Sequence, residues 1–171
     1  SDWQPLFNRS FIENFSRTKS LNRIDAEHYQ PKYTELKKKI AKYSLGPLKD
    51  YFELISYAGH TYNENGSFGV LKTKQVLNGY MTYKAESFTN LEANEVGKTL
   101  KDEDIIFTSM GVGSLGRSAL HLQEYCSEKF TIDSTLKILR QTSEDFFPEV
   151  LQVYLESAVG QELIYQNIVG S

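Results

Sequence analysis

The sequence predicts a mixed fold, with helices toward both ends of the chain and short strands between them. Apolar residues recur at helical spacing after Pro31 and again after Pro148. Between these segments, apolar runs rich in β-branched and aromatic residues alternate with turn signals such as the Asn-Gly pair at 78–79. The length of 171 residues fits one domain with an extension. We expect a partly helical extension over residues 1–30 and a single domain over residues 31–171.

Composition and charge narrow the classes of function. The net charge of -3 counts against a nonspecific nucleic-acid binder, which relies on many phosphate contacts, but allows a reader with a local basic face. The lone Cys126 argues against disulfides and a cysteine-based zinc site, and the three histidines are too scattered to hold a metal. No run approaches the ~20 apolar residues of a membrane span, and the amino terminus lacks a signal-peptide core. We expect a cytoplasmic protein without metal or cofactor.

Two N-terminal segments show helical periodicity. Aromatic residues at every fourth position predict an amphipathic helix over residues 7–15. A second helix should begin at Pro31, because Tyr33 and Leu36 recur on one side while lysines 37–39 lie on the other. Such a lysine run opposite an apolar stripe is usually a solvated face, which we favour over a DNA-facing one.

The middle of the chain predicts a loop followed by a hairpin. Asparagine and glycine are dense in residues 57–67, which marks a loop that also carries groups able to read base edges. Residues 68–76 predict a strand with Lys72 and Lys74 on one face, and residues 80–84 the returning strand after the Asn-Gly turn.

A glycine-rich loop follows the strand predicted over residues 105–107. Three glycines in residues 108–116 match G-x-G-x-x-G, the fingerprint of a dinucleotide-binding fold, and Asp133 sits at the distance of a ribose contact. Only residues 134–171 remain for the further strand-helix units of such a fold. We therefore disfavour it, although an enzyme that binds NAD or ATP at this loop stays a third alternative.

The last part of the chain predicts strands and one helix, and no catalytic motif. Residues 119–122, 130–132 and 135–140 should be strands, and a helix should begin at Pro148, with Gly160 as its weak point. The nucleophile elbow, the P-loop and the Asn-Pro-Pro motif of amino-methyltransferases are missing from the sequence. A noncatalytic binding module fits better than an enzyme.

Four stretches, in order along the chain, share a family resemblance. They are residues 23–33 (RIDAEHYQPKY), 68–76 (FGVLKTKQV), 104–120 (DIIFTSMGVGSLGRSAL) and 148–171, which begins PEVL and ends GS. Together they resemble the target recognition domains of DNA specificity subunits from type I restriction-modification systems. The third stretch resembles the central motif of these domains.

The resemblance implies an α+β fold, with a curved, irregular β core like that of DNA methylase specificity domains and with flanking N- and C-terminal helices. It implies sequence-specific DNA binding, in which the domain reads one half of a bipartite site. The implied partners are double-stranded DNA and methyltransferase (modification) subunits, which in turn position a restriction subunit. We expect the chain to be one recognition domain of a longer bacterial specificity polypeptide.

The candidate DNA-binding residues lie in the two loops and on the strand between them. Asparagine can pair with a base edge, whereas lysines fix register on phosphates. The candidates are His60, Tyr62, Asn63, Asn65, Lys72, Lys74, Ser109, Ser114 and Arg117. Arg117 has an alternative role, in which it braces the glycine-rich loop by bonding to carbonyls.

A function of another class stays open. The Phe/Tyr-rich amino terminus and the C-terminal helix could serve a protein-protein interaction domain that does not read DNA directly. Salt dependence separates the two, because phosphate contacts weaken steeply with salt and an apolar interface does not.

Overall fold

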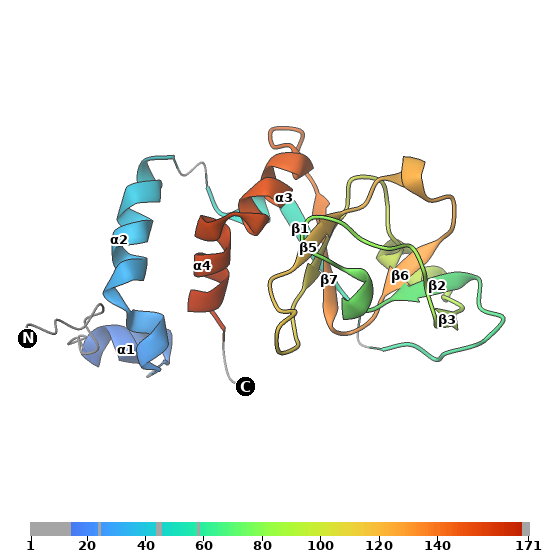
Figure 1. Ribbon diagram of the computed structural model, residues 1–171, viewed down its shortest axis with the longest axis horizontal. Coiled ribbons are helices and arrows are strands. Elements are labelled where there is room, and N and C mark those ends of the chain that lie inside the picture. Colours follow the sequence, from blue (N-terminus) through green and yellow to red (C-terminus); the bar gives the residue numbers. More distant parts are fainter. Residues whose placement is uncertain (1–14, 24, 44–45, 58, 169–171) are drawn as a thin grey trace, which may run out of the picture. The chain divides into compact units, whose positions relative to one another are not determined.

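The computed structural model describes residues 15–23, 25–43, 46–57 and 59–168. The chain divides into two compact units, one of residues 1–45 with 162–171 and one of residues 46–161 (Figure 1). The domain boundary predicted at residue 30 stays a prediction. The helix predicted over residues 7–15 lies outside the described residues except at Phe15, where a helix begins.

The smaller unit is helical. Its described elements are α1 (Phe15–Leu21), the 3-10 helices η1 (Ala26–Tyr29) and η2 (Ala41–Tyr43), α2 (Pro31–Ile40) and the end of α4 (Ala158–Gln166). Helix α2 begins at Pro31 as predicted, since the fixed φ of proline suits the first helical turn. Tyr33 is buried and lysines 37–39 are exposed, as the periodicity predicts. The Nδ1–H of His28 donates to the carbonyl of Gln166 at 2.7 Å, and the Nε2 of Gln166 donates back at 3.0 Å.

The larger unit contains two sheets. The first has four antiparallel strands in the order β1 (Phe52–Ser56), β7 (Leu136–Gln141), β4 (Ile105–Thr108) and β5 (Ser118–Leu120). The second has three strands in the order β3 (Phe88–Thr89), β2 (Phe68–Leu71) and β6 (Phe130–Ile132), and β2 runs parallel to β6. Gly69 lies opposite Phe130, and a Cβ there would come within 2.7 Å of that ring, which explains the glycine.

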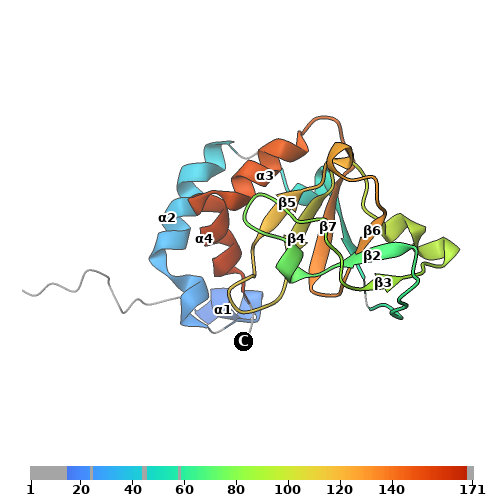
Figure 2. The ribbon, with the colours of Figure 1, turned by 45° about the vertical axis from the view of Figure 1, so that its right-hand side comes forward.

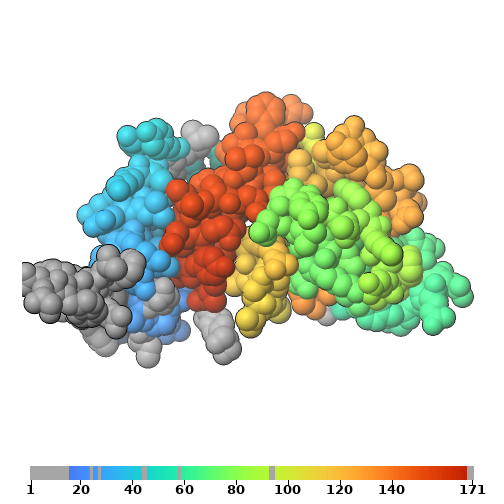
Figure 3. Space-filling view, in the orientation of Figure 1, coloured from blue at the N-terminus to red at the C-terminus, as the bar shows by residue number. Residues whose placement is uncertain are grey.

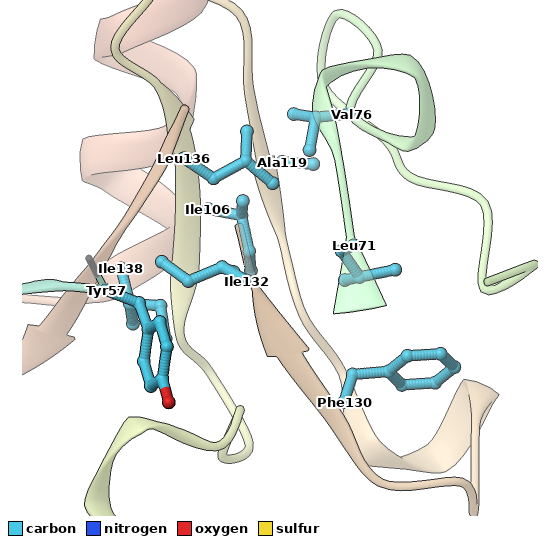
Figure 4. Packing of buried hydrophobic residues seen from close by; sticks show 9 residues of the cluster. All are labelled: Tyr57, Leu71, Val76, Ile106, Ala119, Phe130, Ile132, Leu136 and Ile138. Atoms are coloured by element: carbon cyan, nitrogen blue, oxygen red, sulfur yellow. The ribbon is translucent and has the colours of Figure 1, made fainter. Parts of the chain in front are cut away.

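One apolar core joins the two sheets. Side chains from β2, β4, β5, β6 and β7 point toward one another in Figure 4. The cluster consists of Tyr57, Leu71, Val76, Ile106, Ala119, Phe130, Ile132, Leu136 and Ile138. Burial of such side chains contributes about 1.5–3 kcal/mol each, so this core is what fixes the loops of the larger unit in place.

The acidic end of β4 is anchored by an ion pair. The carboxylate of Asp104 accepts two hydrogen bonds from Arg140, at 2.9 and 2.7 Å, and only 1% of the Asp104 side chain is exposed. Arg140 also donates to the carbonyls of Gly97 and Thr99, which end the 3-10 helix η5 (Ala93–Lys98). Arg140 on β7 thus ties the residue before β4 and the end of η5 to the sheet.

The helix predicted from Pro148 is present but forms two helices. α3 (Pro148–Glu156) ends at Ser157, whose extended backbone breaks the helix before α4 begins. The hydroxyl of Ser157 donates to the carbonyl of Tyr154 at 2.6 Å and accepts the N–H of Gly160 at 3.1 Å. The break falls at a serine that caps the next helix, and not at Gly160.

The hairpin predicted over residues 68–84 is only partly correct. β2 ends at Leu71, and η4 (Thr73–Gln75) follows it, so Lys72 and Lys74 do not share a strand face. Residues 80–84 form no strand, and a single bridge joins Val76 to Met81 across the Asn-Gly turn. The buried Gln75 side chain causes the change, because its Oε1 accepts the N–H of Lys72 and closes a turn.

Strands β1 and β3 are absent from the predictions. β1 lies at a sheet edge with Glu53, Leu54 and Ser56 exposed, and β3 has only two residues, so neither gives a clear apolar run. The remaining 3-10 helices are η3 (Leu48–Asp50) and η6 (Gln123–Tyr125). The predicted α+β class, with helices toward both ends of the chain, is confirmed.

Candidate nucleic-acid interface

The nine predicted residues fall into two groups within residues 46–161. The first lies in the loop of residues 59–67 and in the turn after β2, beside the three-stranded sheet. The second lies in the glycine-rich hairpin of residues 109–117, which joins β4 to β5. Figures 1 and 2 draw the loop (teal) and the hairpin (gold) apart from each other. The predicted residues therefore do not form a single patch.

Three lysines gather around one glutamate in the first group. We define the basic cluster as Lys72, Lys74 and Lys84, with Glu86 among them. Glu86 forms an ion pair with Lys74, and the two side chains are 61% and 51% exposed. The hydrogen bond from Lys74, and then the charges of Lys74, Lys84 and Lys72, lower the pKa of Glu86. The site carries three positive charges and one negative charge at neutral pH.

Gln75 places the basic cluster. Its side chain, 4% exposed, accepts the backbone N–H of Lys72 at 3.0 Å and donates to the carbonyl of Lys84 at 3.1 Å. The backbone carbonyl of Gln75 accepts the N–H of Thr82 at 2.9 Å. One buried amide thus holds the two lysine-bearing segments side by side, so the backbone of the cluster is fixed before any ligand arrives.

The loop of residues 59–67 lies against β3. Asn63 donates its N–H to the carbonyl of Phe88 at 2.9 Å, and its Oδ1 accepts the N–H of Asn65 at 3.0 Å, which forms a tight turn. Gly66 passes so close to Thr89 that a Cβ would lie 2.4 Å from the backbone nitrogen. Asn63 and Asn65 remain exposed on the turn.

Tyr62 connects this loop to the basic cluster. Its side chain is 53% exposed, and the Nζ of Lys72 lies 4.9 Å from the centroid of its ring. The same Nζ donates to the hydroxyl of Ser87 at 2.9 Å. An exposed aromatic face, a cation and a hydroxyl therefore lie together beside the two asparagines.

His60 has an internal role. Its ring stacks on that of Tyr57, with centroids 3.8 Å apart, and its Nε2–H donates to the carbonyl of Ile132 at 2.7 Å. Beneath it, the hydroxyl of Tyr57 donates to Glu95 at 2.5 Å. Burial, and then the bond and charge of Glu95, raise the pKa of Tyr57 to about 12. These contacts brace the start of the loop.

Polar side chains of the hairpin bond to backbone carbonyls, two of them to carbonyls of the hairpin itself. Ser109 donates to the carbonyl of Thr135 at 2.9 Å, and Ser114 to the carbonyls of Met110 and Gly111, both at 3.3 Å. Nη2 of Arg117 donates to the carbonyl of Gly113 at 2.7 Å. The bracing role that the sequence left open for Arg117 is the one that this contact supports.

The tip of the hairpin is apolar, which the sequence analysis did not predict. Val112 is fully exposed and Met110 is 52% exposed. Gly111 and Gly113, on either side of Val112, have φ angles of 110° and 77°, which a residue with a Cβ rarely adopts. In Figure 3 the hairpin (gold) reaches the outer surface of the larger unit.

Lys84, Glu86 and Ser87 were also missed by the sequence analysis. The Asn-Gly turn was recognised, and a chain that returns from it brings residues 82–87 back beside residues 72–75. In a regular hairpin with this register, residues 84 and 86 would face away from Lys72 and Lys74. The turn that Gln75 closes after β2 changes this, so the contact of Glu86 with Lys74 is seen only in the folded chain.

Other kinds of site are not found among the described residues. In that part of the chain, no group of three or more histidine, cysteine, aspartate or glutamate side chains is arranged to hold a metal ion. Nor is any helix there long and apolar enough to cross a membrane. The βαβ unit of a dinucleotide-binding fold is also wrong for this loop, because β4 and β5 are antiparallel neighbours joined directly by it.

Comparison with known proteins gives similarities of structure only. No family model and no curated protein matches the chain. A chain from a study of complex assembly and conformational transition in the type I R-M system matches with a TM-score of 0.47 and 14% identity, over 90% of this chain and 43% of that one. The HsdS subunit from Thermoanaerobacter tengcongensis matches with a TM-score of 0.46 and 15% identity, over 90% of this chain and 42% of the subunit.

The chain spans less than half of the length of either matched protein.

Proposed function

We propose that this chain is a sequence-specific DNA-binding module, the target recognition domain of a restriction-modification specificity subunit. It would read one half of a bipartite site and position methyltransferase subunits and, through them, a restriction subunit. The observation that carries the proposal is the placement of the basic cluster beside an exposed turn with two asparagines. The four stretches of family resemblance agree with it.

The basic cluster supplies the phosphate contacts in this proposal. The whole chain has a net charge of -3, so nonspecific attraction to DNA is weak. Lys72, Lys74 and Lys84 concentrate positive charge in one place, which is what a domain that grips the backbone locally needs. Ser87 adds a hydroxyl next to Lys72.

Base reading falls to the turn next to the cluster. Asparagine can form two hydrogen bonds with adenine in the major groove. Asn63 and Asn65 are exposed, and the Oδ1 of Asn63 already accepts a backbone N–H, so Asn65 is the stronger reader. Tyr62 adds a ring that can stack or contact a thymine methyl group. We assign the domain no catalytic step and place it in the bacterial cytoplasm with its modification subunits.

Selection from a randomised duplex pool tests the proposal. The 171-residue chain is incubated with the pool at low and moderate salt, and bound DNA is sequenced. A recognition domain enriches a short motif of a few base pairs, with affinity that falls steeply as salt rises. Absence of enrichment, both for the chain alone and with modification subunits added, would remove the proposal.

A second candidate is a protein-protein interaction domain, and α3 favours it. Phe147, Val150 and Val153, spaced by three residues, are 68%, 54% and 71% exposed. An apolar helix face of this kind suits a helical partner. Binding of such a partner would change little with salt, whereas DNA binding would weaken, so one salt titration separates the two candidates.

A further inference from the structure

In the chain without DNA, the carboxylate of Glu86 already pairs with Lys74 of the basic cluster. Glu86 and Lys74 are both more than half exposed, so neither charge is needed to fill the core. The segment that carries Glu86 also brings Lys84 to the cluster, and the next residue, Ser87, accepts a hydrogen bond from Lys72. The carboxylate of Glu86 thus contacts one lysine, Lys74, and feels the charges of two more.

The charges do not balance at this place. Glu86 neutralises one of the three lysines, which leaves the charges of Lys84, which is exposed, and of Lys72, which is half-buried. A phosphodiester backbone, which carries one charge for every ~1.7 Å of duplex axis, can neutralise them together. A single phosphate that approaches Lys74 must, however, compete with Glu86 for the same ammonium group.

We propose that the basic cluster is a binding site for DNA phosphates, and that Glu86 is its resident carboxylate, which a phosphate displaces from Lys74. The inference rests on the proposed function and adds to it a residue that opposes binding. The displaced carboxylate stays close to the DNA backbone and repels it, so Glu86 weakens binding to every sequence alike. Affinity for DNA then depends more heavily on the base contacts of the neighbouring turn.

The contacts around the cluster also show that Glu86 is the residue that competes with a phosphate for Lys74. Gln75 fixes the backbone at both Lys72 and Lys84, so the lysines stay in place when the ion pair opens. The side chain of Glu86 is exposed and pairs with Lys74. Replacing Glu86 should therefore free Lys74 without disturbing the cluster.

The test uses Glu86→Gln in the 171-residue chain, with fluorescence anisotropy on two duplexes. One duplex carries the motif enriched by selection and the other a scrambled sequence. Exposed ion pairs are worth little, so the variant should bind both duplexes about two- to fivefold more tightly than the original chain. The gain should be equal on the two duplexes, because phosphate contacts carry no sequence information.

Two control variants make the result specific. Glu128→Gln removes the same charge at an exposed position between η6 and β6, and it should change affinity less than Glu86→Gln. In a Lys74→Gln background, Glu86→Gln should give a smaller gain than in the original chain, because the ammonium that it frees is gone. An unchanged thermal unfolding midpoint for each variant shows that the fold is intact.

Failure of this inference and failure of the proposed function give different results. If the original chain binds DNA but Glu86→Gln binds no better, or gains as much without Lys74, the displacement of Glu86 is wrong and DNA recognition stands. A gain on the selected duplex alone would overturn it too, since Glu86 would then face bases. If no variant binds either duplex at low salt, the proposed function and the inference fall together.

Discussion

The loop of residues 59–67 with its basic cluster and the glycine-rich hairpin of residues 109–117 use polar residues in opposite ways. In the hairpin, Ser109, Ser114 and Arg117 bond to backbone carbonyls, and the tip that remains is apolar. Around the loop, Gln75, His60 and Asn63 make the backbone contacts, and the charged side chains of Lys74 and Glu86 stay exposed. The glycine-rich motif thus stabilises the fold, whereas the less distinctive segment with the basic cluster carries the exposed charge.

The largest expected effect lies on the architectural side, at the ion pair before the start of β4. Asp104→Ala leaves Arg140 without its carboxylate next to β4, and breaking a buried pair in this way costs about 3–5 kcal/mol. Urea denaturation should show this loss in the free energy of unfolding. Glu128→Ala, at an exposed position between η6 and β6, is the control and should stay within about 0.5 kcal/mol. A small loss at Asp104 would show that the pair is not what holds the start of β4 in place.

The next effect lies on the side of the basic cluster. Replacing both Lys72 and Lys74 by glutamine should weaken DNA binding by about ten- to a hundredfold near 0.1 M salt, and should make the slope of log K against log salt shallower by about 1.8. The same change at Lys38 and Lys39, exposed on α2, is the matched control. Equal losses from both pairs would mean that overall charge, and not the cluster, attracts DNA.

A smaller effect is expected from Arg117→Ala. The variant loses the hydrogen bond to the carbonyl of Gly113, which contributes about 0.5–1.5 kcal/mol to stability. The fall in DNA affinity should be smaller than that of the lysine pair, and thermal unfolding beside anisotropy measures both. A loss of affinity as large as that of the lysines, with unchanged stability, would move Arg117 from the architecture to the interface.

The smallest effect concerns the brace beneath the loop. The pKa of Tyr57 is raised to about 12 in the folded chain, above an ordinary value near 10. A raised pKa means that this contribution to stability is present below pH ~10 and is lost as the pH rises toward 12. Absorbance titration of the folded chain should show a tyrosine that ionises near pH 12, and Tyr57→Phe should remove that step. Ionisation of Tyr57 together with the exposed tyrosines would mean that the brace is open.

Much of the fold follows from local patterns, because those patterns depend on neighbours in sequence. Pro31 sets the start of α2, and the apolar run before the glycines gives β4. The two lysines were recognised as a pair, but their shared strand face was wrong, since Gln75 bonds across the turn to Lys84. Neither that contact nor the position of Glu86 beside Lys74 depends on local periodicity, so both require the folded chain.

The parallel pairing of β2 with β6 has a consequence for the order of folding. It joins Gly69 to Phe130, so a long segment, including the whole β4–β5 hairpin, must be in place or be closed as a loop before this sheet forms. Loop closure costs entropy that a local hairpin does not, and such distant pairings form slowly. We expect the hairpin to fold early and the sheet beside the basic cluster to fold late. A chain interrupted between β2 and β6 would then retain the glycine-rich hairpin and lose the basic cluster that we propose as the DNA-binding site.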